Sequence, residues 1–183
     1  VMRIIGGEAK GRKLCVPRGA SVRPTAERIK AAFFNIIQPL NGKSFLDLFA
    51  GTGNMGLEAL SRGAIKAMFI ENNQVMVDAM TRNIATCGFT GRSEILSSDF
   101  ILAVPKLKER SDAFDILFAD PPYERGFVSQ TLEHLGSGAL MAKDGLLAIQ
   151  HSIREAIKDS ESGQLVLIDQ RQYGDTILSF FRI

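Results

Sequence analysis

Short apolar runs alternate with segments of helical spacing along most of the chain. Five runs of mainly apolar residues, each bounded by polar or glycine-containing turns, are typical of buried strands; they cover residues 45–49, 67–70, 93–97, 115–119 and 146–150. Apolar residues three or four positions apart predict helices over 54–62, 75–86 and 100–107 and within 129–135. This alternation is typical of an α/β protein, with an open, mostly parallel sheet and helices on both faces.

A further helix is predicted ahead of the first strand. Thr25 is its expected N-cap and Pro39 its stop signal. The apolar stripe between them consists of Ile29, Phe33, Ile36 and Ile37. Arg28 and Lys30 fall away from this stripe.

The end of the chain departs from the strand and helix alternation. Residues 164–169 and 176–182 read as two strands with only a short turn between them. A short turn joins antiparallel but not parallel strands. The pattern therefore predicts a seven-stranded sheet that ends in an antiparallel hairpin, unlike the six-stranded order of ordinary dinucleotide-binding folds.

Acidic side chains lie at the ends of four predicted strands. They are Asp47, Glu71, Asp99 and Asp120. One such acid is most often a helix cap or a solvated turn residue, but four in succession are poorly explained by coincidence. Ligands of open α/β sheets bind outside the carboxyl ends of the strands, so the four acids mark a candidate ligand site.

The glycine turn after the first strand separates two classes of ligand. The sequence GTGNMG matches G-x-G-x-x-G, a weak signal for a pyrophosphate site. Asp47 lies four residues before Gly51, where a carboxylate would repel a pyrophosphate and attract an ammonium or sulfonium group. We therefore expect a positively charged cofactor with an amino-acid end. Glu71 could then bind ribose hydroxyls, and Asp99 could accept from an adenine amino group while Phe100 covers the ring.

The sequence FADPPYERG ends the fourth strand in a stiffened loop. A proline cannot donate to a sheet ladder, and it pushes the preceding residue out of helical geometry. Pro121 and Pro122 therefore hold Asp120 and Tyr123 near the tip of the strand.

Length and composition limit the class of protein. A chain of 183 residues with 45% hydrophobic content forms one compact domain, and no apolar run approaches the roughly 18–20 residues that span a bilayer. Cys15 and Cys87 lie far apart and have no metal-ligand spacing, and neither has His134 or His151. We expect a reducing, cytoplasmic setting and no metal.

Positive charge gathers at the amino end. Residues 1–30 hold eight basic and two acidic side chains, a net charge of +6, whereas the whole chain carries +2. The segment RIIGGEAKGRKLCVP alternates apolar and basic residues around glycines, which favours a short hairpin over the alternative of a disordered arm. We therefore divide the chain into a basic hairpin or arm over 1–24, suited to gripping phosphates, and a main domain over 25–183.

Together these motifs resemble a known family. DLFAGTGNMGLEALSRGA, FIENN, SSDF and FADPPYERG, in that order, are similar to class I S-adenosylmethionine-dependent methyltransferases. DPPY resembles the [N/D]-P-P-[Y/F] motif of enzymes that methylate amino groups conjugated to a planar system. MRIIGGEAKGRKLCVP and VRPTAERIKAAFFNII resemble the start of the RsmD-type bacterial 16S ribosomal RNA guanine-N2 methyltransferases. Residues 8–10 and 150–151 depart from that pattern, which often has an aromatic at the first place and an acid at the second.

The resemblance implies a class I methyltransferase fold, S-adenosylmethionine as cofactor, and 16S ribosomal RNA as partner, in a small subunit or an assembly intermediate, with the protein acting as a monomer. The implied cofactor-binding residues are Asp47, Phe49, Gly51, Gly53, Glu71, Asn72, Asp99, Phe100 and Asp120. The implied catalytic residues are Asp120, Pro121, Pro122 and Tyr123, in which Asp120 and the Pro121 carbonyl accept from the amine and Tyr123 stacks on the extruded base. The expected RNA-binding residues are Arg3, Arg12, Lys13, Arg23 and Arg28.

Three alternatives stay open. A related methyltransferase could act on adenine in nucleic acid or on a protein glutamine. The second alternative is a nicotinamide dehydrogenase, but Asp47 and the terminal hairpin argue against it. A noncatalytic RNA-binding protein that keeps the fold is the third. Arg23 and Arg28, which flank the predicted helix start, could equally serve packing.

Overall fold

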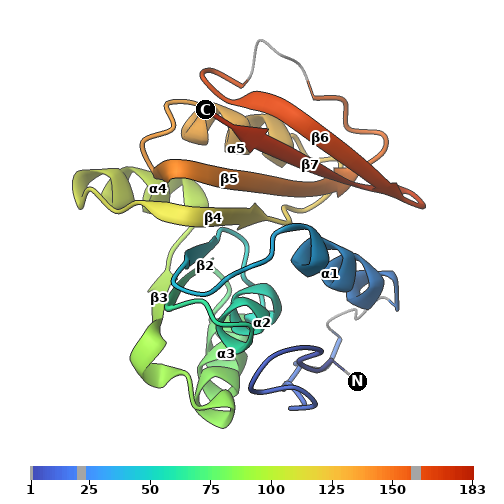
Figure 1. Ribbon diagram of the computed structural model, residues 1–183, viewed down its shortest axis with the longest axis vertical. Helices are drawn as coiled ribbons and strands as arrows, with labels where there is room; N and C mark the ends of the chain where they lie inside the picture. Colours follow the sequence, from blue (N-terminus) through green and yellow to red (C-terminus); the bar gives the residue numbers. More distant parts are fainter. Residues whose placement is uncertain (1, 20–23, 158–161) are drawn as a thin grey trace.

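The computed structural model describes residues 2–19, 24–157 and 162–183, and a seven-stranded sheet of order β3-β2-β1-β4-β5-β7-β6 runs through them (Figure 1). The strands are β1 (Ser44–Asp47), β2 (Lys66–Glu71), β3 (Ser93–Ser97), β4 (Phe114–Ala119), β5 (Met141–Ser152), β6 (Val166–Tyr173) and β7 (Thr176–Arg182). The first five are parallel, and β7 is antiparallel to both β5 and β6. The predicted fold class and terminal hairpin are confirmed.

Helices cover both faces of the sheet and give the protein three layers. They are α1 (Pro24–Ile36), α2 (Asn54–Ser61), α3 (Gln74–Cys87), α4 (Phe100–Glu109) and α5 (Phe127–Leu135), with a short 3₁₀ turn at Thr90–Arg92. One apolar core joins α1, α2 and α3 to the sheet, and a second core on the opposite face joins α4 and α5. None of the helices in the described ranges is long and apolar enough to cross a membrane.

An aromatic cluster anchors the strand that leads into the DPPY loop. Phe33 of α1 packs against Phe118 near the end of β4, with ring centroids 4.9 Å apart, and lies stacked on Phe180 of β7 at 6.4 Å. All three side chains are buried. Burial of each ring contributes about 2–3 kcal/mol, so the position of β4, and hence of the loop after it, is strongly fixed.

Helix α1 differs from the prediction at both ends. It begins at Pro24, before the expected cap Thr25, because the fixed φ of proline suits the first helical turn. It ends at Ile36, before Pro39, since the residues that precede a proline leave helical geometry. Ile36 is 41% exposed rather than part of the buried stripe.

Lys30 was expected away from the apolar stripe of α1, and this prediction was wrong. Its side chain is only 1% exposed. The ammonium lies 3.3 Å from the buried Glu58 carboxylate of α2, and it donates to the Arg3 carbonyl oxygen at 2.7 Å and to Asn54 Oδ1 at 2.8 Å. Glu58 also accepts from Arg62 Nε at 2.7 Å and from the Ile5 amide at 2.9 Å. A lysine on the inner side of α1 is tolerated because these partners replace its water.

The amino-terminal segment, residues 2–19, folds back on itself and packs against the helices. The predicted hairpin is reduced to a single antiparallel bridge, Arg3 to Lys13. Ile4 and Leu14 join the same core as α1, α2 and α3. Gly7 has φ of 75°, and a Cβ there would overlap the carbonyl of Ser61 at the end of α2. The segment is thus a fitted cover on α2 rather than a loose arm.

Asn83 of α3 fastens the other end of this cover. Its Oδ1 accepts from the Cys15 amide at 2.6 Å, and its Nδ2 donates to the carbonyl oxygens of Cys15 and Thr52, each at 3.0 Å. Thr52 belongs to the glycine turn after β1. One buried side chain therefore ties the basic segment to the turn that borders the candidate site.

Two strands are longer or displaced relative to the sequence prediction. β5 extends well beyond residues 146–150, and β6 begins at Val166 and runs to Tyr173 instead of covering 164–169. Both extensions are polar, and β6 is an edge strand whose outward side chains meet water. Backbone pairing, rather than apolar patterning, defines these ends: β5 pairs with β4 at Met141 and with β7 up to Ser152, and β6 pairs with β7.

Candidate active site

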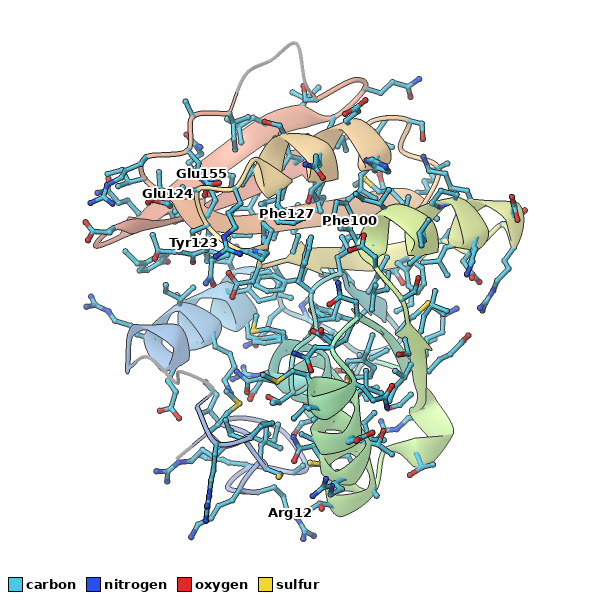
Figure 2. All side chains as sticks on the ribbon, turned by 180° about the vertical axis from the view of Figure 1, so that it is seen from behind. Arg12, Phe100, Tyr123, Glu124, Phe127 and Glu155 are labelled. Atoms are coloured by element: carbon cyan, nitrogen blue, oxygen red, sulfur yellow. The ribbon has the colours of Figure 1, made fainter. Side chains whose placement is uncertain are left out.

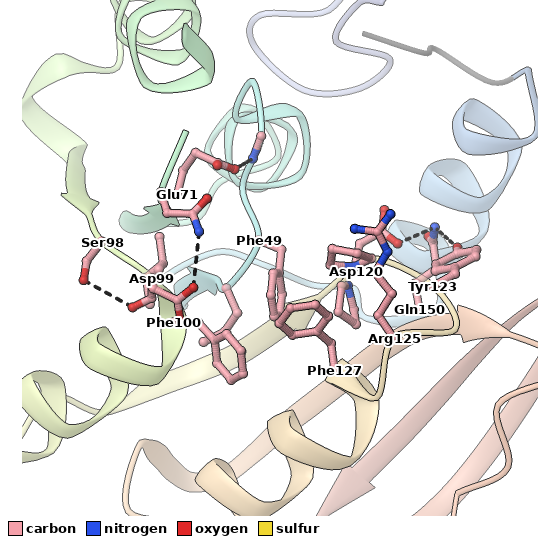
Figure 3. Close-up of a pocket in the computed structure, with 16 residues that line it drawn as sticks. Phe49, Glu71, Ser98, Asp99, Phe100, Asp120, Tyr123, Arg125, Phe127 and Gln150 are labelled. Atoms are coloured by element: carbon pink, nitrogen blue, oxygen red, sulfur yellow. Dashed lines mark hydrogen bonds between the residues drawn. The ribbon is translucent and has the colours of Figure 1, made fainter. Parts of the chain in front are cut away.

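A cavity of about 660 Å³ opens at the carboxyl edge of the parallel strands (Figure 3). Strand order reverses at β1, which lies between β2 and β4, and ligand sites of open α/β sheets form at such a point. The volume falls in the range of roughly 300–1,000 Å³ of small-molecule sites. The predicted residues that line it are Phe49, Gly51, Glu71, Asn72, Asp99, Phe100, Asp120, Pro121, Pro122 and Tyr123.

The glycine turn and the end of β2 are joined by one carboxylate. Glu71 Oε2 accepts from the Gly51 amide and Oε1 from the Asn73 amide, each at 2.8 Å. Gly51 and Gly53 have φ of 53° and 83°, a region that side chains disfavour. Each carboxylate oxygen keeps a second lone pair, so Glu71 can still accept from hydroxyls of a ligand.

Asp99 serves as a helix cap and also faces the cavity. Its Oδ1 accepts from the Ile101 amide at 2.9 Å, the N-cap bond of α4, while Oδ2 accepts from Asn72 Nδ2 at 3.2 Å. Phe100, next to it, packs 4.9 Å from Phe49 and 6.1 Å from Phe127, centroid to centroid. The result is an apolar wall beside a fixed acceptor, an arrangement suited to a purine ring with an amino group.

Asp47 does not line this cavity, and Gly53 lines neither this cavity nor its neighbour. Asp47 is 1% exposed and borders a smaller cavity of about 250 Å³, which it shares with Thr52, Asp120 and Gln150. Burial raises the pKa of Asp47 to about 7, helped by the nearby charges of Asp120 and Glu71, although the Gly56 amide donates to it at 3.2 Å. A buried acid of this kind is stabilised in its charged form by a cation.

The DPPY loop is fixed by its neighbours on both sides. Pro121 is buried, and Glu124 adopts φ of 58° after it. The Glu124 carboxylate accepts from Ser152 Oγ at 3.1 Å and lies 3.3 Å from the Arg154 guanidinium. The loop therefore presents a carboxylate and an aromatic ring on a rigid support.

Gln150 was noted in the sequence only as a departure from the family pattern, yet it lines both cavities. Its Nε2 donates to Asp120 Oδ1 at 3.0 Å and to Tyr123 Oη at 2.9 Å (Figure 3). Sequence reasoning missed its role because β5 brings it to the site from 30 residues away. The signal available in the sequence was that Gln150, like Asp47 and Asp120, is a polar residue at the end of an apolar strand.

Phe127 and Arg125 also line the cavity and were not predicted. Phe127 is the first residue of α5 and packs 6.2 Å from Phe49. Arg125 lies beside Asp120 and Gln150 in Figure 3, and among the described residues that line this cavity it is the one cation. Three carboxylates face the same space, so this guanidinium alone offers a favourable contact to an approaching phosphate.

The expected RNA-binding residues do not border the cavity. Arg3, Arg12 and Lys13 are exposed on the amino-terminal segment, and Arg28 is exposed on α1. Arg12 lies near one end of the long axis of the molecule, far from the loop that carries Tyr123 (Figure 2). Arg23 falls outside the described residues.

The site fits an adenosine-containing cation better than a metal ion. The apolar wall, the Asp99 acceptor and the Glu71 carboxylate match the parts of such a ligand, and the buried Asp47 matches its positive charge. Among the described residues, no group of three or more His, Cys, Asp or Glu side chains is placed to hold a metal ion.

Comparisons with known proteins agree with this geometry. The model of the family described as Conserved hypothetical protein 95 matches residues 2–182. Ribosomal RNA small subunit methyltransferase D of Escherichia coli K12 is 34% identical over 85% of this chain and 77% of its own length. The putative rRNA methyltransferase YlbH of Bacillus subtilis is 32% identical over 99% of this chain and 98% of its own length. The solved structure of a hypothetical protein of Thermus thermophilus, 29% identical, superposes with a TM-score of 0.83 over the whole of both chains.

Family match, fold and site lead to the same conclusion. The chain belongs to the ribosomal RNA small subunit methyltransferase D family, and it is a methyltransferase.

Proposed function

We propose that this protein transfers a methyl group to the exocyclic N2 amino group of a guanine in 16S ribosomal RNA, acting as a monomer in the cytoplasm on the small subunit or an assembly intermediate. The observation that carries the proposal is the place of Asp120. It borders both cavities, so the acceptor for the substrate amine lies where the candidate cofactor-binding residues meet. S-adenosylmethionine, when bound, supplies an electrophilic methyl group on a sulfonium centre.

The cofactor-binding roles follow from the acceptors and rings around the cavity. Glu71 would bind the ribose hydroxyls, and Asp99 would accept from the adenine amino group. Phe100 and Phe49 would cover the ring and exclude water from it. Asp47 would balance the positive charge through the smaller cavity. Each of these side chains is oriented by a backbone or ring contact before any ligand arrives, so little ordering accompanies binding.

The amine chemistry falls to the DPPY loop. An exocyclic amine on a purine is a weak nucleophile because its lone pair is delocalised into the ring. Asp120 and the Pro121 carbonyl would accept its two hydrogens and so orient the lone pair, and Asp120 would take the proton that leaves. Tyr123 would stack on the base after it leaves its helix or loop.

The RNA footprint extends well beyond the cavity. Arg125 at the rim would contact a phosphate next to the extruded base, while Arg12 would contact a phosphate at the far end of the long axis (Figure 2). Lys13, the next residue and also exposed, would contact a neighbouring phosphate. Electrostatic contacts spread over such a length favour a large folded RNA over a short oligonucleotide. A partly assembled small subunit presents that kind of surface.

The test is to incubate the protein with methyl-labelled S-adenosylmethionine and, separately, small ribosomal subunits, free ribosomal RNA, DNA and protein, and to identify the labelled product by mass spectrometry. N2-methylguanosine from a ribosomal sample is the expected result. Label on adenine or on a glutamine side chain would overturn the guanine assignment and leave the cofactor assignment standing.

A variant of the loop tests the assigned role of Asp120. Asp120→Ala should abolish turnover and leave the dissociation constant for S-adenosylmethionine within about threefold, since the residue acts on the amine rather than on the cofactor. Asp169→Ala, which removes a partly exposed acid of β6, is the control and should retain full activity. A large loss of cofactor binding in Asp120→Ala would contradict the proposed role.

A further inference from the structure

Gln150 contacts both functional groups of the DPPY loop through a single atom. It lies near the end of β5, and its Nε2 is 3.0 Å from Asp120 Oδ1 and 2.9 Å from Tyr123 Oη. An amide nitrogen carries two hydrogens, one for each of these contacts. The opposite amide orientation would set a carbonyl oxygen against an ionised carboxylate, so the chemistry of Asp120 fixes which end of the amide faces it.

We propose that Gln150 is a positioning residue for methyl transfer: it locks the proton-accepting carboxylate and the base-stacking ring in one fixed arrangement and keeps that carboxylate ionised. The proposal rests on the proposed function of the DPPY loop. Asp120 and Tyr123 are separated by two prolines, which restrict the backbone between them. The shared donor restrains both side chains at once.

The neutrality of this donor matters because its surroundings are acidic. Asp120 and Glu71 both lie near enough to Asp47 to raise its pKa, and Arg125 is the one cation of the described lining. Each added negative charge would favour protonation of Asp120. A glutamine supplies two hydrogen bonds without adding charge, and a hydrogen bond donated to a carboxylate favours its ionised form.

Replacement by an acid converts this arrangement into a shared-proton pair. In Gln150→Glu, two carboxyl groups about 3 Å apart hold one proton between them over a range of pH, and the protonated glutamic acid has one hydrogen for two partners. As pH rises, that proton is lost and the two groups repel. We therefore expect the turnover number of Gln150→Glu, divided by that of the unmodified protein, to fall progressively between about pH 6 and 9.

Taking the ratio removes the titrations that the substitution leaves unchanged. Gln150→Ala lacks the second carboxyl group, so its ratio should be low but flat across the same pH range. We expect a loss of roughly 10–100-fold in kcat, with the KM for S-adenosylmethionine changed less than about threefold, because misplacement by about 1 Å costs that much in rate.

Tyrosine absorbance gives a readout that does not depend on turnover. The chain has no tryptophan and two tyrosines, so Tyr173→Phe leaves Tyr123 as the sole phenol. A hydrogen bond donated to the phenol oxygen favours its ionised form. In that background, Gln150→Ala should move the midpoint of the phenol's ionisation to higher pH, followed by the ultraviolet absorbance of the phenolate.

The control is Gln170→Ala, which also removes a glutamine hydrogen bond from the sheet, the 2.8 Å bond to Ser179 Oγ, but away from both cavities. It should leave the pH ratio and the Tyr123 midpoint unchanged. Parallel pH profiles for Gln150→Glu and the unmodified protein, or an unmoved Tyr123 midpoint in Gln150→Ala, would overturn the positioning role. An unmodified protein that methylates no nucleic acid would overturn the proposed function instead.

Discussion

The buried ion pair beneath the amino-terminal segment offers a direct test of how the cover is held. Glu58→Ala removes a carboxylate that accepts from Lys30, Arg62 and the Ile5 amide at once. Lys30 then keeps two neutral acceptors, the Arg3 carbonyl and Asn54 Oδ1, and loses the counter-charge within its buried surroundings. Arg62, which is partly exposed, can turn to water.

The expected loss is large for a single substitution. Breaking a buried pair by removing one partner costs about 3–5 kcal/mol, because the other charge stays desolvated. For a domain of this length each kcal/mol corresponds to roughly 2–4 °C, so the melting temperature of Glu58→Ala should fall by roughly 6–20 °C. Glu94→Ala, which removes an exposed ion pair with Arg110, is the control and should change the melting temperature little.

The loss should also depend on pH. Burial lowers the pKa of Lys30, while Glu58 pulls it back up, so the pKa falls further in Glu58→Ala. A lysine whose folded pKa is depressed contributes stability above its unfolded pKa and loses it as pH falls through the folded pKa. The difference between the variant and the unmodified protein should therefore be larger near neutral pH than about three pH units higher, close to the unfolded pKa of lysine, as measured by urea unfolding.

A double substitution separates charge from packing. Lys30→Met with Glu58→Leu removes both buried charges and fills their space, and it should recover most of the stability. If Glu58→Ala proves as mild as Glu94→Ala, or if its cost is the same at both pH values, an uncompensated lysine charge is not the cause.

Three further predictions concern the site and the RNA-binding residues. Asp47→Asn should stabilise the protein above pH 7, where the buried carboxylate is charged, and stabilise it less at acidic pH, because the pKa of Asp47 is raised to about 7 and its stabilising proton is lost as pH rises through that value. The same variant should bind S-adenosylmethionine more weakly above pH 7, as measured by calorimetry. A gain in affinity would contradict the assigned role of Asp47. Arg125→Ala should raise the KM for RNA without changing cofactor affinity, and Arg12→Ala with Lys13→Ala should flatten the salt dependence of RNA binding. Arg171→Ala, which removes an exposed cation of β6, is the control, and a lower affinity of Arg125→Ala for the cofactor would instead place that guanidinium on the cofactor's carboxylate.

The acids at the strand ends could be located from sequence because their positions follow from local rules. Buried strands are short apolar runs, and the residue after each run lies at the sheet edge where ligands bind. Glu71, Asp99 and Asp120 were placed correctly at the cavity by that reasoning alone. The two prolines after Asp120 added the prediction that its loop is rigid.

The remaining features depend on contacts between distant parts of the chain. Nothing near Lys30 in sequence indicates Glu58, in a different helix, as its partner, so helical periodicity placed the lysine on the wrong side. Gln150 reaches the DPPY loop only because β5 pairs with β4. Asp47 was expected to face the ligand directly, but the strand that carries it is buried on both faces.

The packing of the amino-terminal segment has a consequence for how the protein can change over evolution. Ile4, Ala9 and Leu14 point into the core, whereas Arg3, Arg12 and Lys13 point to water on the same short stretch. Substitutions at the outward positions can change the affinity for RNA with little loss of folding stability. Insertions or deletions would shift the inward positions out of register, so this segment is expected to vary in residue type among descendants while keeping its length.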